Sequence, residues 1–241
     1  MEIRLAPLAG VTDWPFRLLC FELGCDCAYT EMVSAMGWSY APQQQATVSL
    51  LERAPGEKKL ILQLFGKEPE LLAGAAYALS REGRYDGIDL NMGCPAHKVA
   101  GSGEGSGLLK DLPLAGRIMD AVVKASALPV SVKCRLGWDD EHLCAMELAH
   151  MAQEAGVGMI AVHGRTREQM YAGQADWEAI ARVKQSVRIP VYGNGDIFTP
   201  QDALQRVRES GVDGLLIARG AMGNPWLFRQ IHEVLEGRAP V

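Results

Sequence analysis

The chain has 241 residues, a formal net charge of −5 and an apolar fraction of 48%, which fits one large domain or two small ones with a sizeable core. The negative charge argues against a strongly basic nucleic-acid-binding surface over the whole domain, although not against a local one. The chain does not open with a cationic segment and an apolar run, and no apolar stretch approaches the roughly 20 residues of a membrane span, so we expect neither a signal peptide nor membrane contact.

Short apolar runs alternate with helical patterns along the whole sequence. The runs are rich in Val, Ile and Leu without strict alternation, as expected of parallel strands that are covered on both faces. In chain order, the predicted strands are Ile3–Ala6, Cys27–Thr30, Leu60–Leu64, Gly87–Leu90, Pro129–Cys134, Met159–Val162, Pro190–Tyr192 and Gly214–Ile217.

Helical patterns follow these strands, and several carry terminal signals such as the N-cap residue Asp13 and the stop residue Gly156. The predicted helices are Trp14–Leu23, Pro69–Arg81, Leu112–Ala125, Glu141–Ala155, Trp177–Gln185 and Pro200–Glu209, with helix plus loop over Gly37–Arg53. About eight strand–helix units in this length predict an α/β fold, a (β/α)8 TIM barrel, as one domain over residues 1–241. A doubly wound sheet is the alternative, but no GxGxxG turn follows the first strand.

Polar residues accumulate at the predicted C-terminal ends of the strands, where a TIM barrel gathers its functional groups. They are Gln63, Asn91, Cys94, Lys133, Arg135, His163, Arg165, Asn194, Asp196 and Arg219. One such residue is readily explained by packing, but six successive strand ends predict a polar site. Cys94 lies between Gly93 and Pro95, beside Asp89 and Asn91, so we expect its thiol to be presented rather than buried. We expect Gly93 to supply backbone angles that other residues avoid.

Two glycine-rich segments, Gly193–Asp196 and Ala218–Asn224, follow the last two strands. Their backbone amides, a following helix start and the guanidinium of Arg219 predict a phosphate site. The six cysteines show no CxxC pair, which indicates reduced thiols in a cytoplasmic protein. We expect no metal site, even where Cys20, Cys25 and Cys27 cluster.

The sequence resembles the tRNA-dihydrouridine synthases, flavin enzymes with an FMN-binding barrel. The matching fragments span Leu5 to Phe228 in the family's order: LAPLAGVTDWPFR, YTEMVSA, LQLFG, DLNMGCPAHKV, SVKCRLGW, VHGRTREQMYAG, YGNGDI and IARGAMGNPWLF. The resemblance implies reduction of the C5–C6 bond of specific uridines in tRNA to dihydrouridine, with FMN as cofactor and NADPH as reductant. We expect a cytoplasmic monomer.

The same resemblance implies roles for individual residues. Those expected to bind FMN are Pro7, Leu8 and Ala9 along the ring, Gln63 at its polar edge, Lys133 and His163 beside it, and Asn194, Gly195, Asp196, Ala218 and Arg219 at the phosphate. Cys94 matches the family's proton donor, a role that suits a thiol because thiols are mostly protonated at neutral pH. Asn91, Lys98 and Arg135 are expected to contact the substrate.

Two departures from the family concern tRNA affinity. The family usually carries a C-terminal helical domain that grips tRNA, which we expect to be absent from this chain, and Glu104 stands where many relatives have a basic residue. Since phosphate contacts dominate affinity, both favour weaker tRNA binding. One alternative is an FMN barrel oxidoreductase that acts on a free pyrimidine, as dihydroorotate dehydrogenases do. Another is a tRNA-binding module without turnover, which the presence of Cys94 and Lys133 disfavours.

Overall fold

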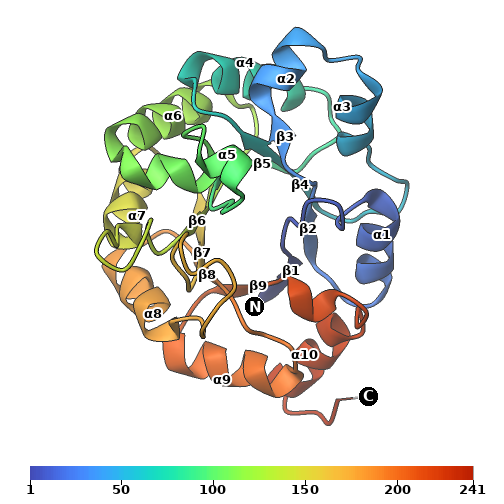
Figure 1. Cartoon of the computed structure of the whole chain (residues 1–241). Helices are drawn as coiled ribbons and strands as arrows, with labels where there is room; N and C mark the ends of the chain where they lie inside the picture. The colour runs from blue at the N-terminus through green and yellow to red at the C-terminus, as the bar shows by residue number, and fades with distance from the viewer. Residues whose placement is uncertain (241) are drawn as a thin grey trace.

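The computed structural model describes residues 1–240 as a closed barrel of parallel strands inside a ring of helices (Figure 1). The barrel strands are β1 (Glu2–Leu5), β2 (Cys27–Tyr29), β4 (Leu60–Phe65), β5 (Gly87–Met92), β6 (Val130–Arg135), β7 (Met159–His163), β8 (Val191–Asn194) and β9 (Gly214–Ile217). Parallel pairing of β1 with β9, and of β2 with β4, closes the ring. The predicted (β/α)8 TIM barrel is therefore confirmed.

The surrounding helices follow the strands in the predicted alternation. They are α1 (Trp14–Glu22), α2 (Ala35–Tyr40), α3 (Gln45–Leu50), α4 (Pro69–Leu79), α5 (His97–Ala100), α6 (Leu112–Ala125), α7 (Ala145–Glu154), α8 (Trp177–Ser186), α9 (Pro200–Ser210) and α10 (Leu227–Leu235), with short 3-10 helices η1 (Gly105–Lys110) and η2 (Arg219–Ala221). Within residues 1–240, no helix combines the length and the apolar character needed to cross a bilayer.

The second strand–helix unit departs most from the usual pattern. The predicted helix plus loop is two short helices, α2 and α3, which flank Pro42. A strand that we did not predict, β3 (Val33–Ser34), precedes them and pairs with the end of β4. Two residues are too few to produce a periodic signal, so β3 depends on its pairing with β4.

Helix α7 begins at Ala145, so the predicted start at Glu141 is wrong. The carboxylate of Asp139 accepts the backbone N–H groups of Glu141 and His142, and Gly137 forms an antiparallel bridge with Leu143. These contacts form a compact turn, which competes with helix formation over the predicted first turn.

Side chains on the barrel strands alternate between a helix-facing core and the barrel interior. Near the N-terminal end the interior is filled by Arg4, which donates to the hydroxyls of Tyr29 and Tyr192 at 3.2 and 3.3 Å. The Tyr192 hydroxyl donates in turn to Glu2 at 3.1 Å. This network fills the lower end, so the barrel is hollow toward the C-terminal ends of its strands.

Strand register brings the polar interior residues together in layers. Gln63 pairs with Asp89, and Asp89 pairs with Ser131 on the next strand. Closer to the barrel mouth, Asn91 pairs with Lys133, and the pairs Arg135–His163 and His163–Asn194 follow. Residues that are 26 to 42 positions apart in the sequence thereby become neighbours.

Candidate active site

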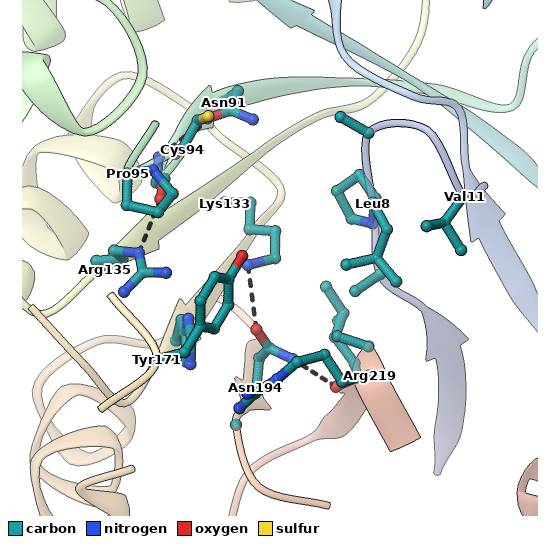
Figure 2. A pocket seen from close by; sticks show the side chains of 18 of the residues that line it. Leu8, Val11, Asn91, Cys94, Pro95, Lys133, Arg135, Tyr171, Asn194 and Arg219 are labelled. Carbon is teal, nitrogen blue, oxygen red and sulfur yellow. Dashed lines mark hydrogen bonds between the residues drawn. The ribbon is translucent and has the colours of Figure 1, made fainter. Parts of the chain in front are cut away.

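A cavity of about 480 Å3 opens at the C-terminal end of the barrel. Of the predicted site residues, those that line it are Pro7, Leu8, Ala9, Gln63, Asn91, Cys94, Lys133, Arg135, His163, Asn194, Gly195, Asp196, Ala218 and Arg219. Lys98 does not line the cavity; it is exposed on α5. Figure 2 shows Leu8 and Val11 on one side and Cys94 and Arg135 on the other, with Lys133 between them.

Cys94 is partly exposed at the cavity wall, on a loop whose backbone is held at several points. The Asn91 side-chain oxygen accepts the N–H groups of Gly93 and Cys94 at 3.1 and 2.9 Å. Ser106 donates its hydroxyl to the Cys94 carbonyl at 2.8 Å, and Arg135 donates to the Gly93 carbonyl at 2.9 Å. The thiol is therefore presented from a fixed loop, as the sequence predicted.

Gly93 is required for a different reason from the one we expected, because its φ is not positive. A Cβ atom at this position would lie 3.2 Å from the backbone carbon of Cys134. A larger residue would therefore require the Cys94 loop or β6 to shift by a few tenths of an ångström. Close approach of two backbones, rather than an unusual dihedral angle, is what selects glycine here.

Lys133 points into the centre of the cavity, where its ammonium donates to the Asn194 side-chain oxygen at 3.2 Å (Figure 2). The Asn194 amide donates in turn to the Leu216 carbonyl at 2.8 Å, which fixes the orientation of the amide. Burial, together with the positive charge of Arg135, lowers the pKa of Lys133 to about 8. At neutral pH Lys133 still carries most of its charge.

His163 lies among cations and is almost fully buried. Burial first, and then the charges of Lys133, Arg135 and Arg165, hold the pKa of His163 well below its ordinary value. The imidazole is therefore neutral near pH 7, with one N–H donor and one acceptor nitrogen.

Arg135, predicted to contact the substrate, lines the cavity, and its Nε and Nη1 atoms donate to the protein backbone. Besides the Gly93 carbonyl, it donates to the carbonyls of Thr166 and Met170, both at 2.8 Å. Burial lowers its pKa to about 10, so it remains charged. Arg135 joins the Cys94 loop to the loop after β7 and adds a positive charge at the cavity wall.

Arg165 and Asp196 form an ion pair between the loops after β7 and β8. The two guanidinium nitrogens donate to the two carboxylate oxygens at 2.9 and 2.7 Å, and Ala175 donates its N–H at 2.7 Å. Burial raises the pKa of Asp196, but the hydrogen bonds from Arg165 outweigh it and the net pKa is lowered. The carboxylate is thus engaged with cations and is not itself an anion ligand.

The loops after β8 and β9 meet beside Arg219. A Cβ atom at Gly220 would lie 2.0 Å from the Ile197 carbonyl, so this contact requires glycine. Asp202 accepts the N–H groups of Phe198 and Thr199 at 3.0 and 2.8 Å. The expected anion attraction from the start of α9 is weakened because an acidic residue already occupies it.

The sequence prediction missed Tyr171 as a site residue. Its ring lies 4.7 Å from the Arg219 guanidinium carbon and 5.7 Å from that of Arg135, and it lines the cavity. Tyr171 lies in the fragment that ends in QMYAG, which the sequence analysis had matched to the family. The sequence of a loop, however, does not show which way an aromatic ring points. The preceding Met170 has φ of 47°, an uncommon angle for a residue with a side chain.

The cavity combines a partly exposed thiol, three cations and an apolar wall, a set suited to a planar anionic ligand and to proton transfer.

Within residues 1–240, no group of three or more His, Cys, Asp or Glu side chains is placed to hold a metal ion. Burial raises the pKa of Cys20 and Cys27 to about 12, so these thiols remain protonated.

Comparisons with known proteins point in one direction. Residues 4–240 match the model of the dihydrouridine synthase (Dus) family. The chain is similar to tRNA-dihydrouridine synthase B of Pseudomonas aeruginosa, at 44% identity over 97% of this chain and 70% of the relative. It is 42% identical to the protein of that name from Xanthomonas campestris, over the same shares. A probable tRNA-dihydrouridine synthase of Rickettsia conorii is 45% identical over 98% of this chain and 70% of the relative. The chain therefore belongs to the dihydrouridine synthase family.

Proposed function

We propose that this protein is an FMN- and NADPH-dependent oxidoreductase that reduces the C5–C6 bond of uridines in tRNA to dihydrouridine. The observation that carries the proposal is the Cys94 thiol, which faces the same cavity as Lys133 and Arg219. Relatives that carry the name tRNA-dihydrouridine synthase match nearly the whole chain. We also propose that residues 1–241 are one catalytic domain, acting as a cytoplasmic monomer.

The residues at the barrel mouth fit a bound FMN. The cavity volume of about 480 Å3 is within the range for small-molecule sites. Pro7, Leu8 and Ala9 offer an apolar wall on which a flat ring system packs. Lys133 in the centre of the cavity and Arg219 on its wall supply positive charge for an anionic ring edge and a phosphate.

The residues proposed to hold FMN are Pro7, Leu8, Ala9, Gln63, Lys133, His163, Asn194, Gly195, Asp196, Ala218 and Arg219. When bound, the flavin supplies the hydride that reduces C6 of the uracil ring. Lys133 lies where its ammonium stabilises negative charge in the cavity, and Asn194 holds it there at 3.2 Å. The Asp196 carboxylate is paired with Arg165 and also contacts Arg219. Its proposed contribution to FMN binding is therefore made by its backbone and by its contact with Arg219.

Cys94 is the proposed proton donor to C5 of the uracil. Its fixed loop holds the thiol at the wall of the cavity, opposite the apolar side at Leu8 (Figure 2). Asn91 and the charge of Arg135 orient the base. To reach this cavity, the target uridine has to leave its stack in the tRNA, as substrates of base-modifying enzymes do. Lys98 is exposed outside the cavity on α5, and its proposed role is contact with the RNA backbone.

The test is reconstitution of the purified chain with FMN, NADPH and tRNA transcribed without modifications. We expect dihydrouridine in the digested tRNA, detected by mass spectrometry, and its loss in the Cys94→Ala variant. Reduction of free uracil or turnover of dihydroorotate, with no change in tRNA, would instead establish a small-molecule oxidoreductase. Failure of the protein to bind FMN would refute the proposal.

A further inference from the structure

Asp89 is a fully buried carboxylate that makes no direct contact with the cavity. Two side chains donate to it: the Ser131 hydroxyl at 2.5 Å and the Gln63 amide at 2.8 Å. Across residues 1–240, no basic side chain lies within ion-pair distance of Asp89, so it serves as an acceptor of neutral hydrogen bonds. Burying a carboxylate without a basic partner costs folding free energy. This cost indicates that Asp89 has a role that an apolar residue could not perform.

The acceptor at Asp89 determines the orientation of the Gln63 amide. Burial raises the pKa of Asp89 to about 6, so the carboxyl group is mostly ionised at neutral pH. An ionised carboxylate can only accept hydrogen bonds, so the Gln63 nitrogen must face it. The Gln63 oxygen is then turned toward Asn91, whose amide nitrogen donates to it at 2.9 Å. A flipped Gln63 would place its oxygen against the carboxylate and its nitrogen against the Asn91 nitrogen.

The orientation of Gln63 in turn fixes that of Asn91, which holds the loop that carries the thiol. With its nitrogen on Gln63, Asn91 presents its oxygen to the N–H groups of Gly93 and Cys94 at 3.1 and 2.9 Å. The second hydrogen of the Asn91 amide points to the Met32 sulfur at 3.6 Å. A flipped Asn91 would set a donor against two donors, which removes both bonds to the loop.

We propose that Asp89 is a positioning residue that orients Gln63 and Asn91 in sequence and thereby fixes the backbone of Cys94. The inference deepens the proposed function, in which Cys94 is the proton donor. The hydrogen bonds run in one direction, from the Asp89 carboxylate, which can only accept, to the backbone N–H groups of Gly93 and Cys94, which can only donate. Strand register aligns its first members, because Gln63 and Asp89 are direct partners on β4 and β5.

Native-state hydrogen exchange of the Gly93 and Cys94 amides, measured by NMR without cofactor, tests this series of hydrogen bonds independently of activity. Asp89→Leu removes the acceptor at similar size and should speed exchange at both amides roughly fivefold to tenfold, the equivalent of about one net hydrogen bond. Asp89→Asn should stay within about twofold of wild type, because its oxygen still accepts from Gln63 while its nitrogen donates to Ser131. If Asp89→Leu does not fold, Gln63→Met interrupts the same series of hydrogen bonds one step later and should give the same increase in exchange rate.

Ser131→Ala is the matched control, since it removes the other donor to the same carboxylate and leaves the path to Cys94 intact. It should not accelerate exchange at Gly93 or Cys94. In an Asn91→Ala background, Asp89→Leu should add nothing further, because the chain is already broken. Unchanged exchange in Asp89→Leu, an equal increase in Ser131→Ala, or an additive effect in the Asn91→Ala background would overturn the inference.

A kinetic comparison separates this inference from the proposed function. If Asp89→Leu speeds exchange and slows dihydrouridine formation at unchanged KM for tRNA, both hold. Faster exchange in Asp89→Leu, together with dihydrouridine formation at the wild-type rate in Cys94→Ala, supports the positioning role of Asp89 and refutes Cys94 as the proton donor.

Discussion

The ion pair between Arg165 and Asp196 offers a direct test of the electrostatics at the barrel mouth. The Arg165 side chain is 2% exposed and that of Asp196 19%, so the pair is largely shielded from water. Replacing Asp196 by Asn removes the charge while keeping the shape. It also suits the backbone, because Asp196 has φ of 50° and Asn tolerates this left-handed conformation.

Removing one partner of a buried pair costs about 3–5 kcal/mol, since the remaining charge is left uncompensated. Two acceptors of Arg165 survive the substitution, the carbonyls of Ala172 and Gly173 at 2.9 and 2.6 Å. We therefore expect the lower end, about 3 kcal/mol, for Asp196→Asn. For a chain of this length, that corresponds to a melting temperature about 6–12 °C below wild type at pH 7.

The assay is thermal unfolding without added flavin, with Asp120→Asn as the matched control. Asp120 pairs with Lys124 at 2.7 Å, but both side chains are more than half exposed, so its loss should shift stability by no more than about 0.5 kcal/mol. The lowered pKa of Asp196 means that its stabilisation is present above the ordinary pKa and is lost as the pH falls through the folded value. The gap between wild type and Asp196→Asn should thus hold from pH 7 to about 5 and narrow below about pH 4. A shift no larger than that of the control, or a gap that widens in acid, would refute the reasoning.

Three further predictions follow from other contacts. Cys94→Ala should retain FMN and its reduction by NADPH but slow flavin reoxidation by tRNA about 10²–10⁴-fold, measured by stopped flow; wild-type reoxidation would exclude Cys94 as the acid. Arg219→Ala should weaken FMN binding by about 1.5–3 kcal/mol in a fluorescence titration, and unchanged affinity would place the phosphate elsewhere. The His232 ring lies 3.1 Å from the Asp26 carboxylate, whose hydrogen bond raises the pKa of the imidazole. Because this stabilisation is complete below the ordinary pKa and is lost as the pH rises through the raised value, the melting-temperature gap between wild type and His232→Gln should shrink from pH 6 to 8; a constant gap would contradict it.

The order of strands and helices and the position of the cavity were predictable from the sequence alone. Apolar runs such as Gly214–Ile217 form strands in the core as predicted, because burial on both faces of a parallel strand leaves a continuous apolar signature. The residues of the mouth were predictable as well, since each lies in the C-terminal half of a strand or in the loop after it, and parallel strands in a barrel end on one face. Cys94, Lys133 and Arg219 line one cavity for this reason.

Tertiary structure decided what each of these side chains contacts. The position of Arg135 at the barrel mouth was predictable, but the backbone carbonyls of two loops that accept from its Nε and Nη1 atoms were not. Gly93 is selected by the backbone of Cys134 on the neighbouring strand, a contact across 41 positions of sequence that no local pattern encodes. The chain from Asp89 through Gln63 and Asn91 exists because strand register sets these residues side by side. Sequence periodicity determines which residues face the barrel interior, whereas pairing between distant strands determines which of them become hydrogen-bond partners.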